Sequence, residues 1–131
     1  FLTTNVLFAI ISQWRDLMSA ATYNLSIDQG TTFALDLTVK EAGVVKDLTG
    51  YQARAQLRRT KSAATAAASF TCSVLIPASQ GKVKMELSAS QSDAIDSGLY
   101  FYDLEIFTAS DVIVKRLIEG QIVLSQSITR D

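Results

Sequence analysis

Residues 96–106, with the sequence Asp-Ser-Gly-Leu-Tyr-Phe-Tyr-Asp-Leu-Glu-Ile, decide the fold. The Asp-Ser-Gly triplet is typical of a tight turn, and the residues after it alternate with a period of two, as in a β-strand with one buried face. One face carries only apolar or aromatic residues and the other is mixed: Tyr100, Tyr102, Leu104 and Ile106 against Leu99, Phe101, Asp103 and Glu105. The stretch therefore predicts a turn that leads into a long, half-buried strand.

The same residues resemble a signature of immunoglobulin-like domains. Asp96, Gly98 and Tyr100 match the first three positions of its D-x-G-x-Y-x-C pattern, which implies that Tyr100 is the corner tyrosine whose hydroxyl binds upstream backbone. Tyr102 stands where such domains have their second disulfide cysteine, and Cys72 is the only cysteine of the chain. Because no disulfide can link the two sheets, the resemblance is to the sandwich class and not to antibody domains.

The segments on either side repeat the alternation. They predict strands at residues 23–27, 33–39, 44–45, 51–59, 70–74, 83–87, 99–106 and 112–126, separated by turn signals about every 8–12 residues. A loop is expected at residues 61–68, a helical turn at 88–95, and a bulge or bend at Gly120. The expected fold is all-β, an immunoglobulin-like antiparallel β-sandwich of about seven strands.

The first seventeen residues have a different pattern, and we expect the domain proper to span residues 18–131. Apolar residues recur at three- and four-residue spacing, which predicts an amphipathic helix over about residues 5–17. We regard its apolar stripe as a candidate interface with Trp14 as anchor: Leu7, Ile10, Ile11, Trp14 and Leu17. The stripe would dock on its own sandwich or on a neighbouring subunit, and both alternatives stay open.

A third alternative is that the domain begins at Met18 and that the upstream residues are an extension of the reading frame. The apolar run at residues 6–11 is far shorter than the ~20 residues that span a bilayer, and no basic segment precedes it. Neither a membrane span nor a secretory signal is therefore expected in residues 1–17.

Composition limits the classes of function. The chain has 131 residues, enough for one self-sufficient core, and its 12 basic and 13 acidic residues give a net charge of −1. We therefore expect neither nucleic acid nor membrane as a partner. Histidine is absent, which removes the commonest general base and metal ligand and argues against an enzyme. A single cysteine fits a reducing compartment or a virion assembled in one, although a secreted protein without disulfides would look the same.

Several side chains could carry chemistry, and a structural role is favoured for each. Arg54, Arg58, Arg59 and Lys61 form a basic stripe that could hold an acidic partner or phosphates, but a solvated strand face is the simpler interpretation. Asp103 and Glu105 are expected on an exposed strand face, without the cleft that acid-base catalysis needs. Cys72 alternates with apolar residues and is expected to pack in the core. No catalytic, cofactor-binding or metal-binding residue is predicted.

Longer pieces resemble structural proteins of tailed bacteriophages. They are residues 23–32 (YNLSIDQGTT), 47–51 (DLTGY), 98–104 (GLYFYDL) and 116–130 (RLIEGQIVLSQSITR), in this order and spacing. The chain resembles the immunoglobulin-like N-terminal domain of phage baseplate upper proteins and related tail, neck and fibre-attachment modules. This resemblance covers nearly all of residues 21–130 and implies a repeated virion component without catalytic residues.

Three functional hypotheses follow. The first is a non-enzymatic structural component of a tailed-phage virion, assembled in the host cytoplasm through contacts with other virion proteins and, in the particle, with copies of itself. The second is a carbohydrate- or receptor-binding adhesion domain, suggested by aromatic residues expected to be exposed, Tyr51 and Phe101. The third, an enzyme using Asp103 and Glu105, ranks last, and the fold alone licenses none of the three.

Overall fold

The computed structural model describes residues 4–13, 21–41, 43–126 and 128, with side chains described from residue 21 onward. Within these ranges the chain is mostly β. In chain order the strands are β1 (Thr4–Gln13), β2 (Ala21–Thr22), β3 (Leu25–Asp28), β4 (Thr32–Glu41), β5 (Val44–Val45), β6 (Gln52–Arg58), β7 (Ala68–Val74), β8 (Lys82–Leu87), β9 (Gly98–Phe107) and β10 (Val114–Ser125). Among the described residues, one helix, α1 (Ala89–Asp93), and two 3-10 turns, η1 (Ala78–Gln80) and η2 (Ala109–Asp111), lie between strands.

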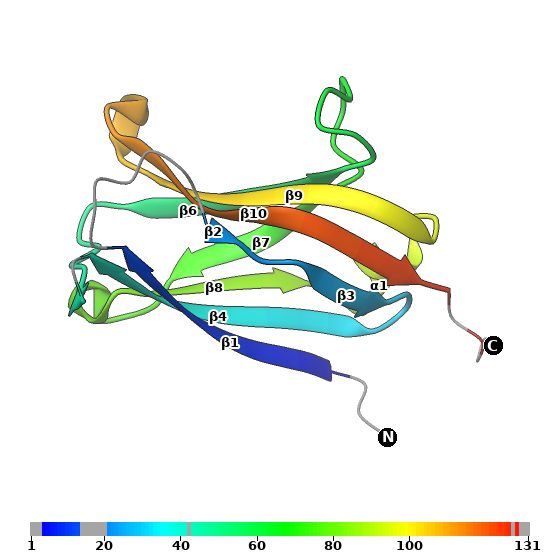
Figure 1. The fold of residues 1–131 in the computed structure, drawn as a ribbon, viewed down its shortest axis with the longest axis horizontal. Helices are drawn as coiled ribbons and strands as arrows, with labels where there is room; N and C mark the ends of the chain where they lie inside the picture. Colours follow the sequence, from blue (N-terminus) through cyan, green and yellow to red (C-terminus); the bar gives the residue numbers. More distant parts are fainter. Residues whose placement is uncertain (1–3, 14–20, 42, 127, 129–131) are drawn as a thin grey trace.

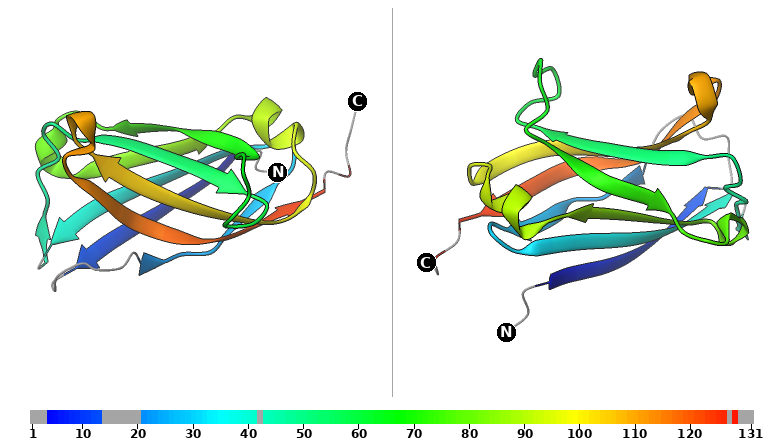
Figure 2. Two further views of the ribbon diagram at one scale, coloured as in Figure 1. Left: turned by 90° about the horizontal axis from the view of Figure 1, so that it is seen from above. Right: turned by 180° about the vertical axis from the view of Figure 1, so that it is seen from behind.

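The strands form one sheet that folds over into two facing layers (Figures 1 and 2). Its order is β1-β4-β8-β7-β6-β9-β10-β2, with β3 also on β10 and β5 on β4. Strand β7 joins the layers, because residues 68–70 pair with β6 whereas residues 71–74 pair with β8. The apolar faces of both layers meet in between, as in a β-sandwich.

The expected antiparallel sandwich is only partly correct, because the sheet is mixed. Strand β1 pairs with β4 in parallel, and both β2 and β3 pair in parallel with β10. The other pairs, which include β4–β8, β6–β9 and β9–β10, are antiparallel. Turn signals predict antiparallel hairpins between successive strands, but they give no direction for strands that meet from distant parts of the chain.

The predicted N-terminal helix is wrong, because Thr4–Gln13 is the strand β1. Its Cα register on β4 places Leu7 opposite Leu35, Ile10 opposite Thr38 and Ile11 opposite Val39. The grouping of these residues into one stripe assumed a period of 3.6, and a strand has a period of two. The segment is rich in β-branched and aromatic residues, and pairing with β4 overrides a helical pattern that is marginal alone. Trp14 and Leu17 lie outside the described residues.

The core fills the space between the layers and follows the predicted alternation. In β9, Tyr100, Tyr102, Leu104 and Ile106 are all buried. An aromatic chain crosses the core: the Phe33 and Phe70 ring centroids are 6.1 Å apart, and those of Phe70 and Tyr102 are 6.4 Å apart, both edge to face. These three residues come from β4, β7 and β9, so the chain of rings connects the two layers.

The turn before β9 has the geometry of a tyrosine corner. The Tyr100 hydroxyl donates a hydrogen bond to the backbone oxygen of Asp96 at 2.6 Å, the bond that a corner tyrosine makes. Gly98 has φ = 138°, and a Cβ there would lie 2.5 Å from Arg59 Nη1. Tyr102, in the position of the missing cysteine, donates its hydroxyl to the backbone oxygen of Tyr23, and burial raises the pKa of Tyr102.

Two other predictions about this half of the chain have different outcomes. The helical turn expected at residues 88–95 is confirmed as α1, which begins with a capping box between Ser88 and Gln91. The bulge expected at Gly120 is wrong, because the register of β10 shifts between Arg116 and Ile118. The extra residue, Leu117, is buried together with Ile118, so the bulge turns two successive side chains inward.

Candidate functional site

The outward face of β6, β9 and β10 is a polar surface, which we call the charged face. The strand register places Glu105 between Arg54 and Arg116, so that one row across the three strands reads positive, negative, positive. In the next row Asp103 lies between Gln56 and Glu119. Because alternate residues of each strand face outward, the core pattern of the sequence also brings these polar residues together.

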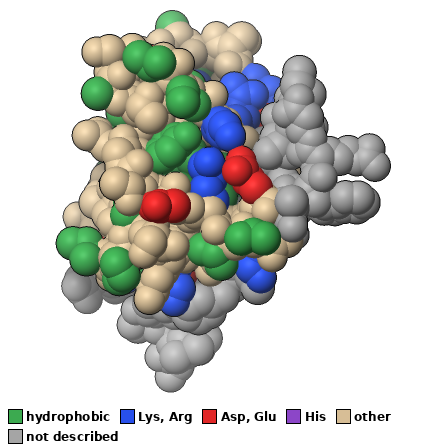
Figure 3. Space-filling view, turned by 90° about the vertical axis from the view of Figure 1, so that its left-hand side faces the viewer, with side chains coloured by type: hydrophobic (Ala, Val, Ile, Leu, Met, Phe, Trp, Pro, Cys, Tyr) green, Lys and Arg blue, Asp and Glu red, His purple; other side chains and the backbone are tan. Residues whose placement is uncertain are grey.

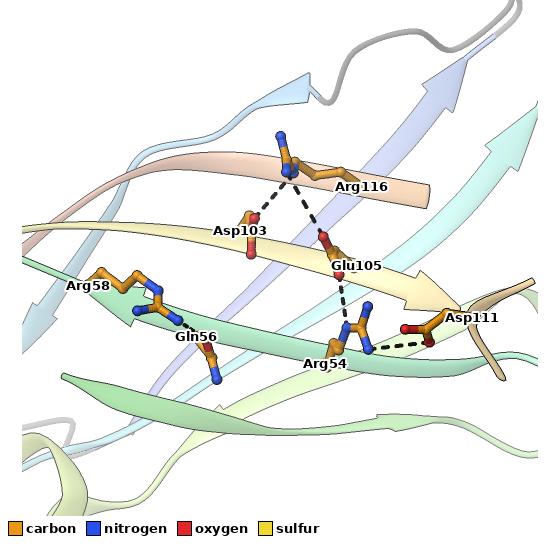
Figure 4. Close-up of polar contacts among 7 residues, drawn as sticks. All are labelled: Arg54, Gln56, Arg58, Asp103, Glu105, Asp111 and Arg116. Atoms are coloured by element: carbon orange, nitrogen blue, oxygen red, sulfur yellow. Dashed lines mark hydrogen bonds and ion pairs between the residues drawn. The ribbon is translucent and has the colours of Figure 1, made fainter. Parts of the chain in front are cut away.

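Ion pairs connect the rows (Figure 4). Arg54 Nε donates to Glu105 Oε1 at 2.9 Å, and its Nη1 lies 3.5 Å from Asp111 Oδ1. Arg116 lies among three carboxylates, with distances of 3.2 Å to Asp103, 4.0 Å to Glu105 and 3.6 Å to Glu119. Each of these carboxylates therefore has an arginine partner, and both arginines are ion-paired within the face.

The close spacing of these charged side chains shifts the pKa values of two of them. Burial raises the pKa of Asp103, and the nearby carboxylates of Glu105 and Glu119 raise it further. The positive charges of Arg116 and Arg58 lower it. For Arg54, the hydrogen bond to Glu105 raises the pKa, so this guanidinium stays charged. The face can offer both carboxylate acceptors and guanidinium donors to a bound molecule.

A hollow of about 780 Å³ lies over the charged face and reaches the point where β6 and β7 separate. Charged and polar residues of the face line it together with Phe101, and Ala53, Phe70 and Cys72 line its apolar part. The separation arises because β7 pairs with β6 only at residues 68–70 before it continues along β8. Planar polar side chains beside an aromatic ring can bind a polar organic molecule by hydrogen bonds and stacking.

The structure divides the predicted basic stripe into two parts. Arg54 belongs to the ion-paired row, and its guanidinium also lies 4.3 Å from the centroid of the Phe107 ring. Arg58 instead donates to Ala63 O and Gln56 Oε1, both at 2.9 Å. Arg59 and Lys61 lie over aromatic rings of β9. The stripe is therefore not a uniform solvated face.

Cys72 lines the hollow, and its thiol is poorly suited to nucleophilic chemistry. It is half-buried, and burial raises the pKa of the thiol to about 12, so the thiol is protonated at neutral pH. Within the described ranges, no group of three or more histidine, cysteine, aspartate and glutamate residues could hold a metal ion. In the same ranges, no helix is long and apolar enough to cross a membrane.

Alkylation of Cys72 by iodoacetamide at pH 8 should be slow in the folded protein. With a pKa of about 12 the thiolate fraction is roughly one in ten thousand, against roughly a quarter for an unperturbed thiol. Mass spectrometry of timed samples measures the rate. The matched control is C72S/S73C, which moves the thiol to the exposed neighbouring position and should react at the rate of an unfolded chain. Equal rates for the two proteins would contradict the burial argument.

A second surface, which sequence reasoning missed, lies at the end of the sandwich on the left of Figure 1. We call it the end surface. It consists of exposed apolar residues from β5, the connection between β7 and β8, and the segment that leads into β10: Val44, Val45, Ile76, Val112, Ile113 and Val114. Leu48 N donates to Ala78 O at 3.0 Å, which joins the segment after β5 to the connection between β7 and β8. Lys115 Nζ lies 3.0 Å from Glu41 Oε2, which joins the start of β10 to the end of β4. Figure 3 looks onto this end and shows hydrophobic side chains among charged ones.

The alternation of residues 112–118 indicated a strand and gave no sign that its beginning is exposed. Strand β10 starts only at Val114, and before it Ser110 and Asp111 have positive φ values of 60° and 53°. The sequence predicts a turn at residues 109–111, and Asp111 tolerates this conformation, but nothing local indicates that Val112 and Ile113 after it are exposed.

Comparison with known proteins gives a fold. No protein-family model and no curated protein sequence matches the chain. Among solved structures, the N-terminal domain of phage TP901-1 ORF48 matches with a TM-score of 0.52 and 12% identity, over 91% of this chain and 98% of that chain. Two other structures are less similar. The cysteine protease inhibitor EhICP2 from Entamoeba histolytica matches with a TM-score of 0.43 and 12% identity, over 91% of this chain and 96% of that chain. PbICP-C in complex with falcipain-2 matches with a TM-score of 0.46 and 11% identity, over 90% of this chain and 98% of that chain. The likeness to the phage domain shows an immunoglobulin-like β fold, and at this identity it shows the fold alone.

Proposed function

We propose that this chain is a non-enzymatic structural component of a tailed-phage virion, in the baseplate, tail, neck or a fibre-attachment module. The observation that carries the proposal is the likeness to the phage TP901-1 ORF48 domain, which extends over 91% of this chain and nearly all of that domain. The sequence pieces that resemble phage baseplate upper proteins point to the same class of protein. Its partners are other virion proteins and further copies of this chain.

The end surface supports assembly through protein contacts. Val44, Ile76 and Val112 are 67%, 95% and 79% exposed, and they lie at one end of the sandwich together with three further exposed apolar residues. A group of exposed apolar side chains rimmed by charges is typical of a protein interaction site. Charged residues lie among these side chains: Lys46 is 3.3 Å and Lys115 is 3.0 Å from Glu41 (Figure 3).

The test of this proposal is the composition of virions. Particles released from the host that carries this gene should contain the chain in a fixed ratio to the other tail proteins, measured by quantitative mass spectrometry. Light scattering after size exclusion should show self-association of residues 1–131 that V112S/V114S weakens and the control L99S/V123S, on the outer face of β9 and β10, leaves unchanged. A shortened chain beginning at Met18 tests whether the first residues contribute. Particles without the chain would refute the virion role.

A second candidate, a carbohydrate- or receptor-binding adhesion domain, is favoured by the hollow over the charged face. Phe101 offers a ring for stacking, and Gln56, Asp103 and Glu105 offer planar polar groups of the kind that bind sugar hydroxyls. A glycan array probed with the purified protein tests this candidate, and an array without signal at high protein concentration counts against it.

A further inference from the structure

We propose that Arg58, Arg59 and Lys61, which we call the basic cluster, form a docking site for a carboxylate-rich segment of a partner protein. The cluster lies at the end of β6 and the start of the connection to β7, which projects from the body of the molecule (Figure 1). The inference concerns this surface only and does not depend on the proposed virion role.

The first argument is that the cluster forms no ion pair with a carboxylate of the described residues. Among the described residues, no carboxylate oxygen lies within 4.0 Å of these three cationic groups. Arg54 and Arg116, on the same outward face, have two and three carboxylate neighbours respectively. A partner carboxylate can therefore bind the cluster without breaking an existing ion pair.

The second argument is that the cluster is held in place. Arg59 lies 4.7 Å from the centroid of the Tyr100 ring, contacts the backbone oxygen of Leu99 at 3.4 Å and covers Gly98 so closely that a Cβ there would clash with it. Lys61 Nζ lies 5.9 Å from the centroid of the Phe101 ring. These contacts reduce the rotamer freedom that an arginine or a lysine loses on binding.

Arg58 is anchored in the same way. One of its terminal nitrogens donates to Ala63 O, within the connection itself, and the other donates to Gln56 Oε1 on β6. Arg58 and Lys61 both line the end of the hollow, whereas Arg59 lies over the Tyr100 ring. Guanidinium groups in fixed positions favour carboxylates, which can accept two parallel hydrogen bonds.

The charge distribution favours an acidic protein segment over nucleic acid. The chain as a whole has a net charge of −1, and the cluster has only three cations. Asp103, Glu105 and Glu119 lie on the same sheet face and would repel a continuous phosphate backbone. A short segment with a few carboxylates can bind the cluster and avoid these acids, which would also limit the positions it can take.

Fluorescence anisotropy with a labelled peptide of alternating Glu and Ser tests the inference. We expect the peptide to bind wild-type protein at low ionic strength and to be released by added salt, whereas the same peptide with Gln in place of Glu should not bind. R59Q/K61Q should weaken binding about tenfold, because each charge-assisted contact contributes to the affinity. The matched control K82Q/K84Q removes the same charge from β8 and should change the affinity less than about twofold.

K61E, a single change at an exposed loop position, provides a second test if R59Q/K61Q disturbs the corner, and it should also weaken binding. Circular dichroism checks the fold of each variant. The inference is overturned if the Glu peptide does not bind, if K82Q/K84Q weakens binding as much as R59Q/K61Q, or if an oligothymidylate of equal charge binds more tightly than the peptide.

Discussion

Phe33→Ala should lower the free energy of unfolding by about 3–5 kcal/mol, the cost of removing a fully buried ring. Phe33 is inaccessible to solvent, and its ring packs edge to face on Phe70, which packs in turn on Tyr102. The substitution would leave a cavity at the centre of the aromatic chain that connects the layers, and β4 and β9 are held in paired strands that can collapse into it only in part. Urea denaturation followed by circular dichroism measures the change.

Leu99→Ala is the matched control for this experiment. Leu99 is 44% exposed and lies on the outward face of β9, so its truncation should cost less than about 1 kcal/mol. Similar losses for the two variants would mean that the aromatic chain does not carry the packing of the two layers.

Gly120→Ala should have the next largest effect, a loss of about 2–4 kcal/mol, because the added methyl group has no room. A Cβ at Gly120 would lie 2.5 Å from Tyr23 O and 2.9 Å from Asn24 Oδ1. The connection between β2 and β3 would have to move away from β10. That movement would strain the bonds from Tyr23 N to Glu119 O and from Gln121 N to Asn24 Oδ1. Urea denaturation measures the loss.

Gly50→Asn separates this clash from the general cost of replacing a glycine. Gly50 has φ = 84° with no atom within 4 Å of a Cβ placed there, and asparagine tolerates this backbone conformation. Its loss should stay below about 1 kcal/mol. If Gly120→Ala were no more destabilising than Gly50→Asn, the close approach of residues 23–24 to β10 would not matter for stability.

The two proposed interfaces differ in physical character, and contacts at them should respond differently to salt. The end surface is apolar, so contacts there should be insensitive to salt and should gain most from the exclusion of water. The basic cluster is charged and exposed, so its contacts should weaken as ionic strength rises. Between them, the arginines of the charged face are already paired with carboxylates, which leaves the hollow to polar ligands.

The errors of sequence interpretation have a common origin. Residues 5–17 had a helical spacing of apolar residues, yet residues 4–13 pair with β4, because an edge strand offers a row of backbone groups that no local pattern records. The spacing of the basic residues at 54–61 predicts one solvated face. Its division into a neutralised Arg54 and an unpaired cluster depends on Glu105 and Asp111, about fifty residues away in the sequence.

The sequence by itself determined the buried face of strands such as β3, β8 and β9, where the chain turns, and that Asp96, Gly98 and Tyr100 have the pattern of a corner, because alternation and turn chemistry are local properties. Only the tertiary structure decided strand direction and order, the role of the first segment, the pairing of charges on the sheet and the gathering of exposed apolar residues at one end. These features depend on contacts between segments distant in the sequence, and a period of two specifies a face without specifying the neighbour that it meets.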